Sequence, residues 1–346
     1  MFESFSERGM NQPNKKRWIF VAIVALAAAS AAFFVFGPSK PEPLYQGRPV
    51  SFWIEQMGGR RVQGSFVPLP PNDETWKAFS RTNQDALPFL IATLKARQPL
   101  RDVLVARWRP ILPRKIAAGL PLRDYPVEFA KASALFAISR MGPNAREAVP
   151  ALINALTDKQ TRIRHAAADA LGKVGPAAMN ALPALVVRSL RDADFQVRLA
   201  ALDSSNRIAP DEQRFLSSLS VSLTDKHKAV RFRAAELLLA KNRESTALFL
   251  TLTGLLREPD ARDRWHAIEL LRKAGPEAAV VVPALIERLK DENNRVRGLA
   301  AIVLGEVGPA AVLAVPAVRE ALKDEFSNVR EAAAETLKKI APEERQ

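Results

Sequence analysis

Three histidines are the side chains of this sequence best suited to metal ligation or to proton transfer near neutral pH. They are His165, His227 and His266, which lie far apart along the chain, and the sequence contains no cysteine. A zinc site of the protease type needs two histidines one helical turn apart, and most structural zinc sites need thiolates. Neither pattern occurs, and we find no paired nucleophile and base and no glycine-rich phosphate loop. The sequence therefore predicts a protein without metal, cofactor or enzymatic activity.

Acidic and basic residues recur at a nearly fixed interval in the second half of the sequence. Six arginines belong to this series, namely Arg164, Arg198, Arg231, Arg264, Arg297 and Arg330. An acid stands six residues before each of them, namely Asp158, Asp192, Asp225, Glu258, Asp291 and Asp324. The period of about 33 residues is typical of a solenoid, in which each unit buries its apolar face only against its neighbours.

Each repeat reads as two antiparallel helices. Residues 282–288 carry apolar side chains at helical spacing, a polar turn follows, and residues 296–307 resume the helical period before a glycine. Prolines stand at the start of the first helix and again seven residues later, at 143 and 150, 176 and 183, 276 and 283, and 309 and 316. The second proline of each pair must kink the helix or restart it. The predicted N-caps of the second helix are Asp194, Asp260 and Asn293.

The motifs GP, VPAL, a turn acid and VR together resemble HEAT repeats, in particular the short phycobilisome-lyase-type repeats, over about residues 130–341. The resemblance implies an all-α, armadillo-like, right-handed α-solenoid of about seven helical hairpins, with the second helices on the concave face. It also implies that the recurring acids and arginines form a ladder of buried pairs between repeats. Some HEAT-like enzymes place His-Glu pairs on matched helices, and no such dipeptide occurs here. A lyase-type HEAT enzyme with an unrecognised site stays an alternative.

The first repeat is disguised by an insertion. Residues 86–90 match the start of the later repeats, but Pro88 precedes Pro150 by nearly two repeat lengths, where one is expected. The inserted residues are about 98–126. They include a basic stretch with Arg101, Arg107, Trp108, Arg109 and Arg114.

The N-terminal segment predicts one membrane-spanning helix. Residues 18–36 carry no charge and follow Lys15-Lys16-Arg17, and a helix of this length covers roughly 28 Å, about one hydrocarbon core. The positive-inside rule places the N-terminus in the cytoplasm and the solenoid on the other side of the cell membrane. A cleaved signal peptide, cut near Ala29-Ser30-Ala31, is the alternative. The predicted parts are 1–17, a cytoplasmic tail; 18–36, the membrane helix; 37–82, a connector; and 83–341, the solenoid.

The connector is predicted to hold a short helix that begins after Ser51 and a loop over residues 58–73. Its motif YQGRPVSFW, at residues 45–53, together with the inserted first repeat, is similar to a group of bacterial membrane-anchored HEAT-repeat proteins. That similarity supports a single-pass anchor followed by a solenoid.

One position of the second helices differs between repeats in a way that suggests a binding surface. It lies two residues after the Val of the VR motif, and we call it position +2. A helical projection places it about 200° away from the core, and its occupants are His165, Leu199, Phe232, Trp265, Gly298 and Glu331. Leu199, Phe232 and Trp265 are therefore predicted to form an exposed apolar ridge that binds a protein or peptide partner. Acids at position +6 with bases four residues later, such as Asp203 with Arg207, are predicted to pair along one helix.

The net charge of +14 leaves acidic partners open. Lys and Arg are spread through the chain, which makes nucleic acid an unlikely partner. The second hypothesis is contact with anionic lipid or polymer through Arg101, Arg107, Trp108, Arg109 and Arg114. The preferred interpretation is a membrane-anchored HEAT scaffold without catalytic function.

Overall fold

The computed structural model describes residues 44–45, 48–49, 59–62, 65–68, 83–96, 127–241 and 245–341. The chain separates into two compact units, one formed by Met1–Ala78 with Lys95–Ser133 and the other by Phe79–Leu94 with Ala134–Gln346. The predicted membrane helix, the short helix after Ser51 and the insertion lie outside the described residues, so these three predictions stay predictions.

The first unit contains two short antiparallel ribbons. Strand β1 (Leu44–Tyr45) pairs with β2 (Arg48–Pro49), and β3 (Gly59–Val62) pairs with β4 (Ser65–Pro68). The loop predicted for residues 58–73 is therefore wrong where β3 and β4 form. The sequence carries the signals of a hairpin, because Val62 precedes, and Phe66 and Val67 follow, a two-residue connection that contains a glycine.

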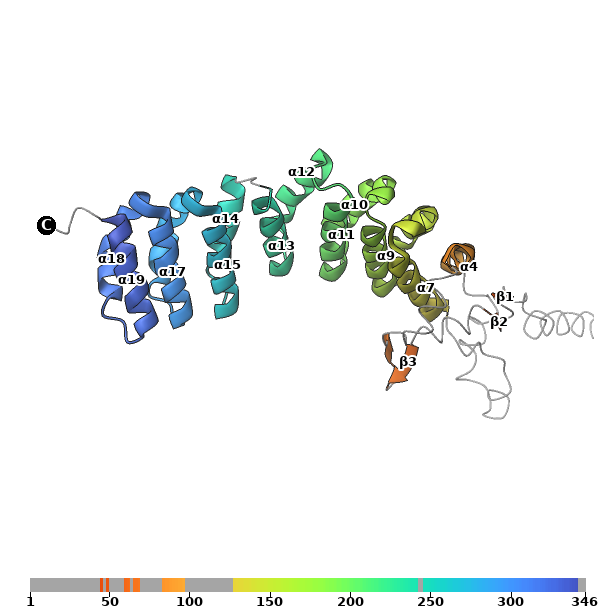
Figure 1. Ribbon diagram of the computed structural model, residues 1–346, viewed down its shortest axis with the longest axis horizontal. Helices are drawn as coiled ribbons and strands as arrows, with labels where there is room; N and C mark the ends of the chain where they lie inside the picture. Colours follow the sequence, from red (N-terminus) through yellow and green to blue (C-terminus); the bar gives the residue numbers. More distant parts are fainter. Residues whose placement is uncertain are drawn as a thin grey trace, which may run out of the picture. The chain divides into compact units, whose positions relative to one another are not determined.

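The second unit is a helical solenoid of two layers. The first helices, with the 3₁₀ segments that precede four of them, are η2 (Gly142–Ala148) and α8 (Val149–Ala155), η3 (Gly175–Ala181) and α10 (Leu182–Arg191), α12 (Gln213–Ser222), α14 (Thr246–Leu255), η4 (Gly275–Val281) and α16 (Val282–Arg288), and η5 (Gly308–Ala314) and α18 (Val315–Ala321). The second helices are α9 (Thr161–Val174), α11 (Phe195–Ile208), α13 (Lys228–Leu239), α15 (Ala261–Ala274), α17 (Asn294–Val307) and α19 (Ser327–Ile340). Figure 1 shows the second helices side by side in one row, with the first helices in another.

Helices α4 (Asn83–Lys95) and α7 (Val127–Met141) take the places of the first and second helices of the repeat that carries the insertion. The six hairpins from α8 to α19 lie within the described residues, and the seventh, inserted repeat stays a prediction. The core lies between the two layers and is built from fully buried apolar residues such as Leu182, Phe215, Leu271 and Leu285. The solenoid is thus confirmed, whereas its predicted handedness stays a prediction.

The Gly-Pro pairs explain how each Pro-containing repeat turns. Gly142, Gly175, Gly275 and Gly308 have φ between 56° and 74°, a left-handed conformation that glycine adopts without steric cost. The first proline then opens a short 3₁₀ segment, and the second proline is the second residue of a new α-helix. Of the two predicted outcomes for the second proline, the structure shows a restarted helix.

The predicted N-caps are confirmed. The Asp194 carboxylate accepts the backbone N–H groups of Gln196 and Val197, and Asp260 and Asn293 cap α15 and α17 in the same way. The caps provided by Glu212, His227 and Ser245 were not predicted.

Two stretches of the solenoid, Thr161–Arg191 and Asn294–Ala321, have the length and apolar composition of a membrane span. Each comprises a second helix, a 3₁₀ segment and a first helix. About half of the most apolar window of each, 50% and 56%, is buried inside the solenoid. Their apolar character therefore follows from their place in the core.

The recurring arginines and acids form a ladder between repeats, as the resemblance implied. Arg264 donates from Nε and Nη2 to both carboxylate oxygens of Asp291, each at 2.8 Å, and from Nη1 to the carbonyl oxygens of Glu258 and Pro259. The other members are Arg164 with Asp192, Arg198 with Asp225, Arg231 with Glu258, and Arg297 with Asp324. The hydrogen bond from Arg297 lowers the pKa of Asp324 below its usual value, as expected for an ion pair. Each rung joins one repeat to the next.

We expect Arg264→Leu to lower the free energy of unfolding by about 3–5 kcal/mol, because the buried Asp291 carboxylate would lose its bidentate partner and keep only the 3.3 Å contact with Arg288. Urea unfolding followed by circular dichroism measures the loss. Arg330→Leu is the matched control: Arg330 stands at the same position of the last repeat, is exposed and donates to the carbonyls of Asp324 and Glu325. Equal losses for the two variants would show that the ladder does not stabilise the stack.

Candidate functional site

The three residues of the predicted apolar ridge differ in their environments. Trp265 is 42% exposed, as predicted, and Leu199 is half-buried against the core. Phe232 is only 6% exposed, so the prediction of an exposed Phe232 is wrong. Its ring stacks on the imidazole of His266, with centroids 4.6 Å apart and an interplanar angle of 11°.

The reason lies in the direction of position +2. A Cβ built on Gly298, which occupies this position in α17, would lie 3.2 Å from the Asn328 side chain and 3.9 Å from Val329 of α19. Position +2 therefore points sideways to the next second helix. The helical projection treated this direction as solvent, and in a solenoid it is partly filled by the neighbouring repeat.

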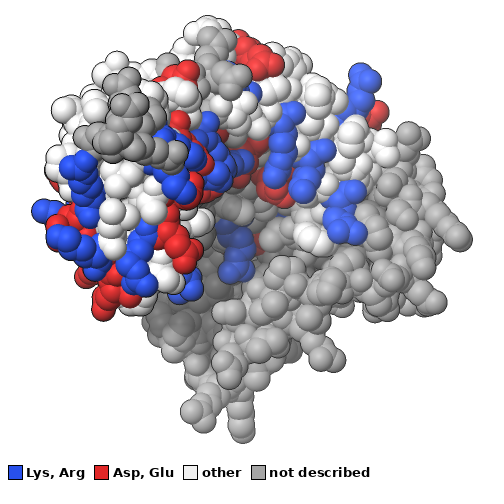
Figure 2. All heavy atoms as spheres, turned by 60° about the vertical axis from the view of Figure 1, so that its left-hand side comes forward, with Lys and Arg blue, Asp and Glu red and all other residues white. Residues whose placement is uncertain are grey.

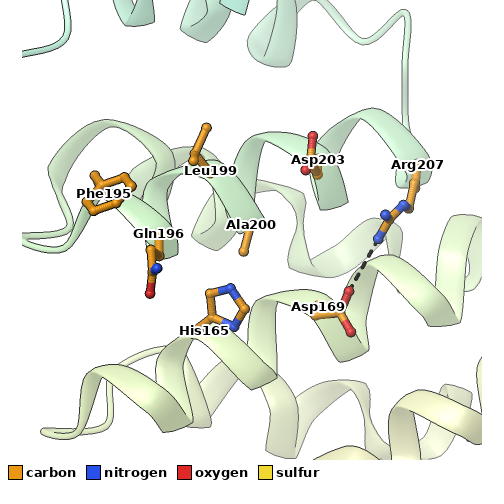
Figure 3. A pocket seen from close by; sticks show the side chains of 8 residues that line it. All are labelled: His165, Asp169, Phe195, Gln196, Leu199, Ala200, Asp203 and Arg207. Atoms are coloured by element: carbon orange, nitrogen blue, oxygen red, sulfur yellow. Dashed lines mark hydrogen bonds and ion pairs between the residues drawn. The ribbon is translucent and has the colours of Figure 1, made fainter. Parts of the chain in front are cut away.

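A hollow opens between α9 and α11 on the side where Leu199 lies (Figure 3). Its volume is about 420 Å³, and its lining residues are His165, Asp169, Phe195, Gln196, Leu199, Ala200, Asp203 and Arg207. Phe195, Leu199 and Ala200 supply its apolar surface, while Asp169 and Arg207 close one end with an ion pair of 3.4 Å. The hollow can hold an apolar side chain of a partner and can offer hydrogen bonds around it.

Charged side chains continue this surface toward α15. Arg233 of α13 donates to Asp203 of α11 at 2.6 Å and to Glu236 at 2.8 Å, and Glu236 lies 3.2 Å from His266 of α15. Burial opposes the charge of Arg233, but the hydrogen bonds to Glu236 and Asp203 outweigh it and raise the pKa of this side chain. These contacts link three successive second helices.

These contacts correct the predicted pairing of Asp203 with Arg207 along α11. Arg207 pairs with Asp169 of the preceding helix and not with Asp203, four residues before it. Asp203 in turn pairs with Arg233 of the following helix. The second helices lie close enough for such pairs, and the bonds between helices also tie separate repeats together.

Several residues of this surface were not predicted as part of it. They are Phe195, Gln196 and Ala200 in the hollow and Arg233 and His266 beside it. Arg233 and His266 occupy position +3, directly after the ridge position, where α11 has Ala200 and α17 has Leu299. Variation at +3 was the sequence signal that could have identified them.

Acidic and basic side chains are interspersed on the face shown in Figure 2. Among the described residues, no three His, Cys, Asp or Glu side chains are grouped to hold a metal ion. The predicted anionic contact residues Arg101, Arg107, Trp108, Arg109 and Arg114 lie outside the described residues. The face shown in Figure 2 is therefore better suited to a partner of mixed polarity than to a polyanion.

Alanine substitutions test the different roles of Phe232, which is buried, and Trp265, which is exposed. We expect Phe232→Ala to cost about 3–5 kcal/mol of stability because it opens a cavity in the core. Trp265→Ala should change stability by about 1 kcal/mol or less, as an exposed site. Thermal unfolding of both variants measures this. A large loss for Trp265→Ala would show that its ring supports the fold.

Comparison with known proteins agrees with the repeat architecture. A family model described as HEAT repeats matches residues 122–206 and 282–346. No curated protein matched the chain.

Solved structures that resemble the chain include an engineered protein, with 19% identity, a TM-score of 0.44 and coverage of 84% of this chain and 83% of that one. Importin beta has 15% identity and a TM-score of 0.47, and the match covers 84% of this chain and 45% of importin beta. Human deoxyhypusine hydroxylase in complex with glycerol has 23% identity and a TM-score of 0.31, with 77% of this chain and all of that chain covered. The matched family model and the repeated hairpins show that residues 122–206 and 282–346 of the chain consist of HEAT repeats.

Proposed function

We propose that the protein is a membrane-anchored scaffold that binds a protein or peptide partner through the second helices α9, α11, α13 and α15. A HEAT array supports a role in protein interaction in general, because its stacked repeats present one extended surface. The observation that carries the specific proposal is the 42% exposure of Trp265 on the same helix layer as the hollow at Leu199. Tryptophan is among the residues that most often dominate binding energy at interfaces.

The contacts around these two residues fit an interface. The ion pairs Arg207 with Asp169 and Arg233 with Asp203 satisfy the charges near the apolar groups. A partner that covers them would therefore not bury an unpaired charge, which is the costly case. Phe232 packs beneath this surface, where it is buried and its ring stacks on the imidazole of His266.

The membrane part of the proposal rests on the sequence. Residues 18–36 are uncharged and follow three basic residues, which favours an anchor with the solenoid on the non-cytoplasmic side. The second hypothesis, anionic contact through the basic insertion, stays a prediction because that segment lies outside the described residues.

Photo-crosslinking in membranes tests the binding proposal. We expect a crosslinked partner to be lost in Trp265→Ala and retained in Leu313→Ala, whose side chain is 75% exposed in the other layer. Hydrophobic contact at Trp265 should also survive high salt, which screens surface charge. Loss of the partner in high salt and in the Arg107→Glu/Arg109→Glu variant, with Trp265→Ala unaffected, would contradict the proposal and support the anionic contact.

Extraction of membranes at alkaline pH tests the anchor. We expect the intact chain to stay in the membrane pellet, and added protease to digest the solenoid only from the non-cytoplasmic side. A soluble chain that begins near residue 30 would instead show that the segment is a cleaved signal peptide.

A further inference from the structure

Helices α9 and α11 are held close together near their C-terminal ends. The buried Ser204 hydroxyl of α11 donates to the carbonyl oxygen of Ala168 in α9 at 2.7 Å. Gly172 makes this approach possible, because a Cβ at that position would lie 2.5 Å from the Ser204 oxygen. We call this combination of a glycine with a hydroxyl donor a glycine–hydroxyl clamp.

The same clamp recurs between α17 and α19. The buried Thr336 hydroxyl donates to the carbonyl oxygen of Ala301 at 2.6 Å, and a Cβ on Gly305 would lie 2.8 Å from the Thr336 oxygen. The glycines occupy the same position of the repeat in α9 and α17, and the hydroxyl residues occupy the same position in α11 and α19. The two clamps are therefore one device that is used at two places in the solenoid.

The three pairs of second helices between these clamps lack both components. At the glycine position α11, α13 and α15 carry Asn206, Leu239 and Arg272. At the hydroxyl position α13, α15 and α17 carry Leu237, Leu270 and Val303. Larger side chains at the crossing keep helix axes further apart, so these pairs do not form the close contact of the clamped pairs.

The ladder nevertheless continues through the middle repeats at the opposite end of the same helices. Arg198 with Asp225, Arg231 with Glu258 and Arg264 with Asp291 pair at 2.7–2.8 Å. The middle helices are thus joined by the ladder near their N-terminal ends and, further along, by ion pairs of more exposed side chains such as Arg233 with Asp203 and Arg272 with Glu306. They have no clamp near their C-terminal ends. Two of the middle repeats also lack the Gly-Pro 3₁₀ segment, since α12 and α14 begin directly as α-helices.

We propose that the solenoid flexes in its middle, with α11, α13, α15 and α17 opening and closing at their C-terminal ends about the ladder. The pairs α9 with α11 and α17 with α19 move as rigid blocks. Leu199 lies on one block and Trp265 lies within the flexing part, so bending changes the distance between the two proposed contact residues. Only this last consequence rests on the proposed function.

The absence of cysteine from the sequence allows spin labels to be attached at two introduced cysteines in the full-length chain in detergent. The pair Ala240→Cys/Lys273→Cys spans α13 and α15, and the pair Glu306→Cys/Lys339→Cys spans the clamped helices α17 and α19. All four positions are exposed and stand at the same place in their repeats, so both pairs are separated by one repeat length. We expect a wider distance distribution for the first pair than for the second, measured by electron paramagnetic resonance.

Breaking the clamp should convert the rigid pair into a flexible one. Gly305→Ala, whose methyl group would meet Thr336, should widen the distribution of the second pair toward that of the first. Thr336→Val, which removes the donor without adding volume, should widen it less, and unchanged helicity by circular dichroism confirms that both variants fold. Equal widths for the two labelled pairs, or a second pair that neither substitution widens, would overturn the proposal.

Discussion

The pairing of one arginine with the acid of the next repeat is the constraint on which the rest of this structure depends. The guanidinium of Arg264 spans two turns, since it donates to carbonyl oxygens of its own turn and to both carboxylate oxygens of Asp291 in the next. Asp291 also accepts the backbone N–H of Asn293 and so shapes the turn that it occupies. A bidentate pair has a narrow geometry, so one side chain fixes both the turn and the spacing between repeats.

Because the ladder sets the spacing between repeats, most other positions of the helices can differ from one repeat to the next. The ladder lies at the turns, near the N-terminal ends of the second helices, and it sets the register there whatever side chains follow. Further along the helices the end repeats add a glycine–hydroxyl clamp, whereas the middle repeats carry larger side chains at the same positions. The charged contacts of Arg233 with Asp203 and of Glu236 with His266 occur in this middle region. The stack is thus uniform at one end of each helix and variable at the other.

The features that sequence reasoning predicted are those determined within one repeat or by strict recurrence. The regular repeat period, the caps at Asp194 and Asn293 and the helix breaks at the Gly-Pro pairs follow from local rules. The errors concern neighbours: Phe232 is buried by the adjacent repeat, and Arg207 pairs with Asp169 of another helix. A helical projection treats one helix alone and leaves out the helix that packs beside it. Of the ridge, only the exposure of Trp265 was therefore predicted fully.

Because Phe232 is buried, the residues of the predicted ridge do not all face solvent. Positions +2 and +3 of successive helices meet, as Phe232 and His266 do at 4.6 Å, so a side chain at +2 contributes both to packing between repeats and to the outer surface. Where the next helix provides a flat partner such as an imidazole, the aromatic ring is covered. In α17 position +3, which follows Trp265 of α15 in the same relation, holds the aliphatic Leu299 and no flat ring. The exposure of Trp265 is thus set by pairs of residues in adjacent repeats, and a recognition surface on this solenoid has to be read from two helices together.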